Sequence, residues 1–136
     1  MTMKKSAISA IVLGATLLAG GVALAGLKLS LPVTVIRNAD GSGTASGAMG
    51  AVRNSADGTE VLTCATTTVA GSVTGSCSAI NAAPIPVNLT CTTTDSEMVA
   101  AIRSVTTDSF VKFLSDNTGK CISITVENAS YYEPKK

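Results

Sequence analysis

The sequence predicts an α+β protein that is mainly β, with an antiparallel sheet and one short helix, stapled by two disulfides. After residue 25 the chain is rich in Thr, Ser, Ala, Val and Gly and poor in aromatic residues, which favours strands over long helices. Its candidate strands are separated by turn signals such as Asp-Gly and Ala-Gly. Four cysteines lie in the same part, and an even count in a small exported domain is typical of a disulfide framework.

Residues 1–25 have the organisation of a secretory signal peptide. Two lysines give a positive start, residues 8–18 form an apolar stretch of secretory length, and Ala-Leu-Ala ends at Ala25 as a small-x-small cleavage pattern. The apolar stretch is too short and too Gly-rich for a membrane span. We therefore expect cleavage before Gly26, and a single globular domain over residues 26–136 in the periplasm or outside the cell.

Charge and composition exclude several classes of partner. The whole chain carries a formal charge of +1, and no basic patch of the kind that binds nucleic acids is visible. We expect no nucleic-acid partner and no stable membrane insertion once the signal is removed. No metal or cofactor is expected either, because the chain has no His and no CxxC spacing. Residues 38–43 resemble the opening of a calcium loop, but Met49 stands where its last carboxylate ligand belongs.

The first part of the predicted domain contains one strand and a less regular stretch. Residues 31–37, Leu-Pro-Val-Thr-Val-Ile-Arg, predict a strand with its Pro near the start, where no backbone hydrogen bond need be donated. Residues 38–43 form a turn cluster. Residues 44–53 are rich in Gly and Ala and predict an irregular or closely packed strand, and 54–59 contain another turn.

A hairpin is predicted from residues 61–68 and 72–79, with its turn at 70–71. In that register Cys64 lies directly opposite Cys77, within the Cα separation that a disulfide requires. A slip of one residue would separate the two cysteines, so the pairing depends on the turn. The register favours this pairing among the three that four cysteines allow. The remaining pair is Cys91–Cys121.

One short strand around residues 87–91 precedes the only helix that the pattern indicates. Thr94 and Glu97 match a capping box, in which the hydroxyl and the carboxylate satisfy each other's backbone amides. Apolar residues then recur at helical spacing and form one stripe. The stripe consists of Met98, Ile102 and Val105.

A second hairpin is predicted from residues 109–114 and 121–127, around a loop in which Gly119 suits a left-handed conformation. Pairing Leu114 with Cys121 places both on the face opposite the core, together with Phe110. The predicted core face consists of Val111, Phe113, Ile122, Ile124 and Val126.

Few combinations of residues support catalysis. Without His, Ser-His and Cys-His activation is excluded, and paired cysteines leave no free thiolate. Ser109 and Lys112 match S-x-x-K, but on a strand residues three apart point to opposite faces. The hairpin register pairs Asp108 with Glu127, whose carboxylates could act as an acid and a base. Like charges opposite each other are destabilising, however, so divergence of the strands is favoured.

Tyr131 and Tyr132 are the candidate contact for a partner. We expect one to pack on the sheet and the other to lie at its rim. The chain has no Trp, so an aromatic platform for sugars is poorly supplied.

Two blocks resemble small exported bacterial proteins of unassigned function. They are residues 43–64, GTASGAMGAVRNSADGTEVLTC, and residues 121–135, CISITVENASYYEPK. The resemblance implies export and a shared two-disulfide fold, and it implies nothing about mechanism.

The sequence favours a non-catalytic exported binding protein, such as an envelope factor or an inhibitor of a secreted enzyme. Its expected partner is another exported or envelope protein. One alternative is a structural or surface-assembly subunit, because Thr- and Val-rich strands suit edge-to-edge association. The other alternative is a small hydrolase that uses carboxylates.

Overall fold

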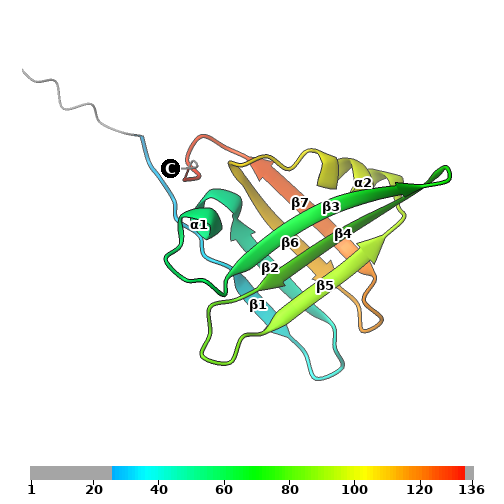
Figure 1. Ribbon diagram of the computed structural model, residues 1–136, viewed down its shortest axis with the longest axis horizontal. Coiled ribbons are helices and arrows are strands. Elements are labelled where there is room, and N and C mark those ends of the chain that lie inside the picture. Colours follow the sequence, from blue (N-terminus) through cyan, green and yellow to red (C-terminus); the bar gives the residue numbers. More distant parts are fainter. Residues whose placement is uncertain (1–25, 134–136) are drawn as a thin grey trace, which may run out of the picture.

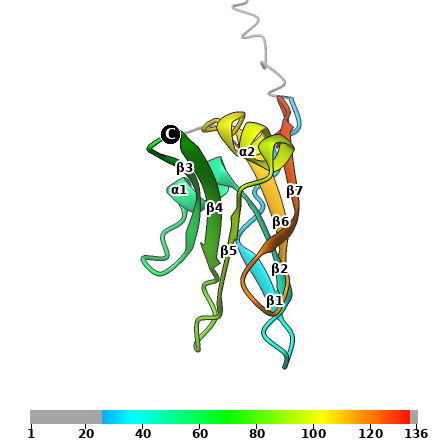
Figure 2. The ribbon, with the colours of Figure 1, turned by 90° about the vertical axis from the view of Figure 1, so that its right-hand side faces the viewer.

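The computed structural model describes residues 26–133 as two antiparallel sheets packed face to face (Figures 1 and 2). The elements are β1 (Thr34–Arg37), β2 (Gly43–Ala48), α1 (Met49–Asn54), β3 (Val61–Val69), β4 (Ser72–Ile80), β5 (Asn88–Thr93), α2 (Ser96–Arg103), β6 (Ser109–Ser115) and β7 (Cys121–Asn128). One sheet has the order β1-β2-β6-β7 and the other the order β3-β4-β5. The mainly β class with antiparallel pairing is confirmed, with two sheets and two helices where one of each was expected.

The structure bears on the predicted membrane behaviour only for residues 26–133. The proposed signal peptide, residues 1–25, lies outside the described residues. Within residues 26–133, no helix has the length and apolar character needed to cross a membrane.

The stretch over residues 44–53, predicted to be an irregular or closely packed strand, is a strand only in its first part, and the helix that follows was not indicated by the sequence. β2 lies between β1 and β6, and α1 begins directly after it. Ala48 and Ala51 are buried beside Tyr132, so small side chains allow the close packing of this region. α1 has no side-chain hydrogen bond at its N-cap, and for this reason no capping signal marked its start.

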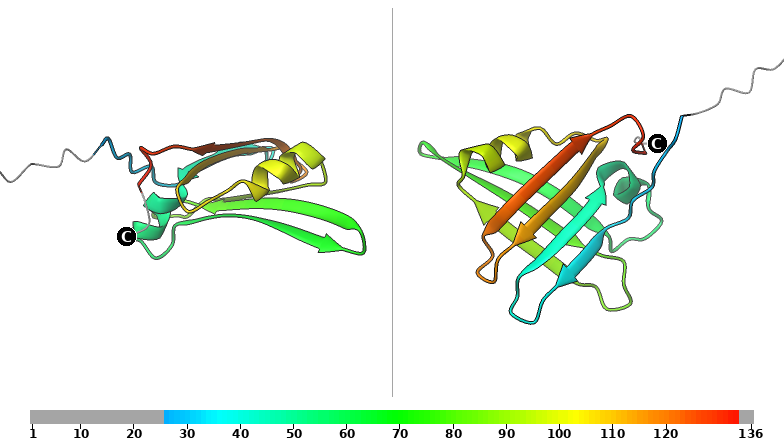
Figure 3. Two further views of the ribbon diagram at one scale, coloured as in Figure 1. Left: turned by 90° about the horizontal axis from the view of Figure 1, so that it is seen from above. Right: turned by 180° about the vertical axis from the view of Figure 1, so that it is seen from behind.

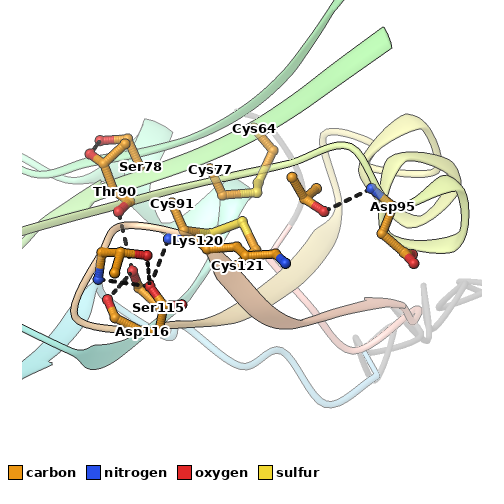
Figure 4. Close-up of a disulfide and its surroundings, with 12 residues drawn as sticks. Cys64, Cys77, Ser78, Thr90, Cys91, Asp95, Ser115, Asp116, Lys120 and Cys121 are labelled. Carbon is orange, nitrogen blue, oxygen red and sulfur yellow. Dashed lines mark hydrogen bonds between the residues drawn. A yellow bond between two sulfur atoms is a disulfide. The ribbon is translucent and has the colours of Figure 1, made fainter. Parts of the chain in front are cut away.

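Both disulfides form as predicted (Figure 4). Cys64 lies opposite Cys77 in the β3–β4 ladder, with 4.1 Å between their Cα atoms. The turn is the predicted one, and its two residues, at 70 and 71, have positive φ values of 46° and 82°. Cys91 of β5 bonds Cys121 of β7, so the second disulfide joins the two sheets.

Helix α2 covers one end of the sandwich, but its cap differs from the predicted one. Asp95 is the N-cap, and its Oδ1 accepts hydrogen bonds from the backbone N–H groups of Glu97 and Met98 at 3.0 and 2.9 Å. A single carboxylate there satisfies two amides, which displaces the capping box expected from Thr94. The apolar stripe faces the core as expected: Val99 and Ile102 are buried, and Met98 and Val105 are partly buried.

A β-bulge in the β6–β7 hairpin overturns part of the predicted register. Leu114 pairs with Ser123 and Ser115 pairs with Cys121, which leaves Ile122 as the extra residue. The bulge reverses the face shown by the first residues of β7. Cys121 is therefore 2% exposed inside the core, whereas Ile122, expected in the core, is 57% exposed. The other expected core residues face inward: Val111 and Phe113 are buried, and Ile124 and Val126 are partly buried.

Candidate interaction surface

The three-stranded sheet presents a face without charged side chains to the outside. Alternation along β3 turns Leu62 and Cys64 toward the other sheet and every second residue outward. The outer face consists of Val61, Thr63, Ala65, Thr67 and Val69 of β3, Ser72, Thr74, Ser76, Ser78 and Ile80 of β4, and Asn88, Thr90 and Thr92 of β5. Charged residues make up 14% of the chain, yet none of the residues of this face is charged. The Arg37 side chain reaches the face at one corner, where its guanidinium donates to Asn88 Oδ1 at 3.3 Å.

The side chains of the outer face form rows across the strands. Thr63, Ser78 and Thr90 make one such row, and the hydroxyl oxygens of Ser78 and Thr90 are 2.8 Å apart in a hydrogen bond. Neighbouring strands lie about 4.8 Å apart, so the rows place small polar groups and methyl groups at regular spacing. The cores of protein interfaces are depleted in charged residues, and this face has that character.

The edges of the two sheets differ in how well they are protected from pairing. β1 has only four residues, follows Pro32 closely and ends in Arg37. In β5, the Thr92 N–H donates to the Gly119 carbonyl oxygen at 2.9 Å, and β7 carries Glu127 and a bulge. Short length, proline, charge, bulges and a covering loop all discourage edge-to-edge association. β3 has none of these: it is nine residues long, uncharged and paired with β4 in unbroken register.

The β3–β4 hairpin also reaches beyond the rest of the sandwich. In the view from above, its tip extends past helix α2 (Figure 3, left). Along the second half of β3, the residues at 67, 68 and 69 are all exposed. The second half of β3 is therefore accessible to another chain, whereas Val61 and Leu62 at its start line a cleft together with Met49, Val52 and Arg53 of α1.

The two predicted contact tyrosines lie together in a cluster at the end of the chain. Tyr132 is buried and stacks on Phe110, with 5.7 Å between ring centroids, and Tyr131 lies half-buried beside it. This agrees with the expected division into a packed and a rim residue. Both hydroxyls donate to the Glu127 carboxylate, and the backbone N–H of Leu29 donates to the Tyr131 carbonyl. The cluster fixes the two ends of the described chain together, and a role in partner contact stays a prediction.

The proposed acid pair is not formed. Glu127 lies opposite Phe110, because the bulge shifts the register, and Asp108 precedes β6 without a cross-strand partner. Ser109 is buried and hydrogen-bonded to Asn128, whereas Lys112 is exposed on the other face of β6. The S-x-x-K residues thus point apart, as the strand prediction required.

Hydrogen bonds from Tyr131 and then Tyr132 lower the pKa of Glu127 below its ordinary value of 4.5. The contribution of these bonds to stability is therefore present above that value and is lost as the pH falls through the lower pKa of the folded state. We expect tyrosine fluorescence to change in this acid range, and with two Tyr and no Trp in the chain the signal comes from the cluster alone. Glu127→Gln should abolish the change. A change of equal size in that variant would contradict this assignment.

The supposed calcium loop over residues 38–43 is a closed turn. Asp40 Oδ1 accepts from the N–H and hydroxyl of Ser42 at 3.0 and 2.7 Å, which closes the supposed calcium loop as a turn. Over residues 26–133, no three His, Cys, Asp or Glu side chains gather in one place. A cleft of about 350 Å³ lies between Arg37, Asn88 and Thr118. In the same part of the chain, no buried side-chain polar atom lacks a hydrogen-bond partner.

Comparison of the chain with protein-family models, with curated proteins and with solved structures finds no match. The fold, a β-sandwich linked by two disulfides, and its outer face of uncharged residues are therefore the basis for inferring a function.

Proposed function

We propose that this chain is a non-catalytic exported binding protein, and that the outer face and the free edge of β3 form its interaction surface. The observation that carries the proposal is that every residue of the outer face is uncharged, beside an edge strand with no protection against pairing. The expected partner is an exported or envelope protein with a similarly uncharged surface.

Two further observations support this proposal. Both disulfides suit an oxidising compartment, in agreement with the signal peptide predicted for residues 1–25. The carboxylates on which a hydrolase would have depended, Asp108 and Glu127, are not paired, and Glu127 is engaged by two tyrosines.

Site-specific photo-cross-linking in the producing cells tests the proposal. A photoreactive amino acid at Ser76, in the middle of the outer face, should give a discrete adduct whose partner peptide can be identified by mass spectrometry. The matched position is Thr125, an exposed strand residue of the four-stranded sheet. Adducts from Ser76 and not from Thr125 are expected. Equal adducts from both positions, or none from Ser76, would contradict the proposal.

The unprotected edge of β3 also favours the second function, a subunit of a surface assembly. That function requires association that continues beyond two copies. Its test is the size distribution of the purified protein over a range of concentrations, and growth into long assemblies would favour it.

A further inference from the structure

The residues of β3 whose side chains face outward have a symmetric order, which is the same from either end of the strand. They are Val61, Thr63, Ala65, Thr67 and Val69, so the outer side of the strand has the order Val-Thr-Ala-Thr-Val. An antiparallel pair of identical strands has a twofold axis between them. With the axis at Ala65, each outward residue lies opposite a residue of its own kind in the second copy.

This register gives favourable pairs along the entire strand. Val61 meets Val69, Thr63 meets Thr67, and Ala65 meets Ala65 of the other copy. Pairs of β-branched residues and of threonines stabilise antiparallel sheets, and no charged residue is brought opposite another. Nine paired residues provide about eight to ten backbone hydrogen bonds across the axis.

The surroundings of β3 leave room for such a partner. The first charged residue before the strand, Glu60, is turned back into its own chain, where its carboxylate accepts the Val33 N–H. At the other end, the exposed turn at residues 70–71 carries no charge. Arg53 lines a cleft with Val61, and Arg103 lines one with Gly71 and Ser72, so charge lies near the two ends of β3 but not among its outward side chains. A second copy presents the same uncharged row of side chains to this edge.

We infer that two copies of this chain pair through β3 in antiparallel register about Ala65, forming a continuous six-stranded sheet. This inference deepens the proposed function, on which it rests, by naming a second copy as one partner. The pairing is closed because both copies use the same edge. At the far edge of the sheet, the Thr92 N–H of β5 already donates to the Gly119 carbonyl oxygen. This edge is therefore not free to pair with a further strand, and the sheet does not extend beyond six strands. Pairing through β3 therefore produces a dimer and not a filament.

Cross-linking through an added cysteine tests the register. Ala65→Cys places two thiols opposite each other at the twofold axis, within disulfide distance. Thr67→Cys is the matched control, because its thiol would lie opposite Thr63 and far from its own copy. Oxidised Ala65→Cys should run as a covalent dimer, and Thr67→Cys should stay largely monomeric. Equal cross-linking of the two variants would overturn the register.

Sedimentation velocity with paired charge variants tests the association itself. Thr63→Lys with Thr67→Lys opposes like charges at two places and should weaken the dimer by about tenfold or more. Thr63→Lys with Thr67→Glu opposes unlike charges and should keep the dimer within about threefold of the unmodified protein. Equal weakening by both variants, or an unmodified protein that is monomeric up to millimolar concentration, would overturn the inference. Adducts from Ser76 to a different protein would still support the proposed function, because Ser76 lies on β4, outside the paired edge.

Discussion

Replacing Cys91 and Cys121 together by alanine is expected to lower the free energy of unfolding by about 3–5 kcal/mol. This disulfide joins β5 of one sheet to β7 of the other, across 30 residues of sequence. Its cysteines are 0% and 2% exposed, so their removal also disturbs the core between the sheets. Urea denaturation monitored by far-ultraviolet circular dichroism measures the loss.

Cys64→Ala with Cys77→Ala provides the control. That disulfide spans only 13 residues, within a hairpin already closed by its turn. Chain entropy alone makes its contribution smaller by about 0.7 kcal/mol, and the local hairpin keeps its residues close even in the reduced protein. A larger loss from this pair than from Cys91 and Cys121 would contradict the assigned role of the second disulfide.

Phe113→Ala is expected to cost about 3–5 kcal/mol of stability. Phe113 is fully buried on β6, opposite Ile124 of β7, and it is the largest fully buried side chain among the described residues. Its removal leaves a cavity between the two sheets that the neighbouring strands cannot fill without shifting. The same denaturation experiment measures the effect.

Ile122→Ala is the matched control for the β-bulge. Ile122 is 57% exposed, so its truncation should cost less than about 1 kcal/mol. Without the bulge, Ile122 would lie in the core beside Phe113, and its truncation would cost about 2–5 kcal/mol. A loss in that higher range would show that the simple register is correct and the bulge is not.

The sequence predicted best where structure is local. The turn at residues 70–71 determined the β3–β4 register, and with it the partners Cys64 and Cys77. Two-residue turns fix the register of a hairpin, and the cysteines then follow from their distance to the turn. The β6–β7 hairpin was also found, but a bulge adds one residue without changing composition. Alternation alone therefore placed Cys121 and Ile122 on the wrong faces.

Long-range pairing could not be predicted. β2 pairs with β6 more than sixty residues away, as in Ala45 opposite Phe113, and no local signal marks that choice. The division into two sheets depends on this pairing. Helix α1 also went unrecognised, since its six residues have neither a side-chain cap nor a long apolar stripe.

The candidate surface was only partly visible in the sequence. Every second residue from 61 to 69 gives the order Val-Thr-Ala-Thr-Val in the sequence. The alternation does not determine which set of residues faces outward, nor whether β3 lies at the edge of a sheet. Both follow from the order β3-β4-β5 and from the second sheet packed beneath it. Tyr131 and Tyr132 lie as expected, one packed and one at the rim, and their role in partner contact stays a prediction. Their shared acceptor, Glu127, was assigned to a different partner.

Backbone hydrogen exchange of the purified protein, followed amide by amide at low and high concentration, tests the central claim most directly. If β3 is the interaction edge, the amides of residues 61–69 that do not bond β4 should exchange more slowly at high concentration, while the amides of β1, β5 and β7 should exchange at unchanged rates. Exchange in β3 that is independent of concentration, together with new protection at another edge, would contradict the account.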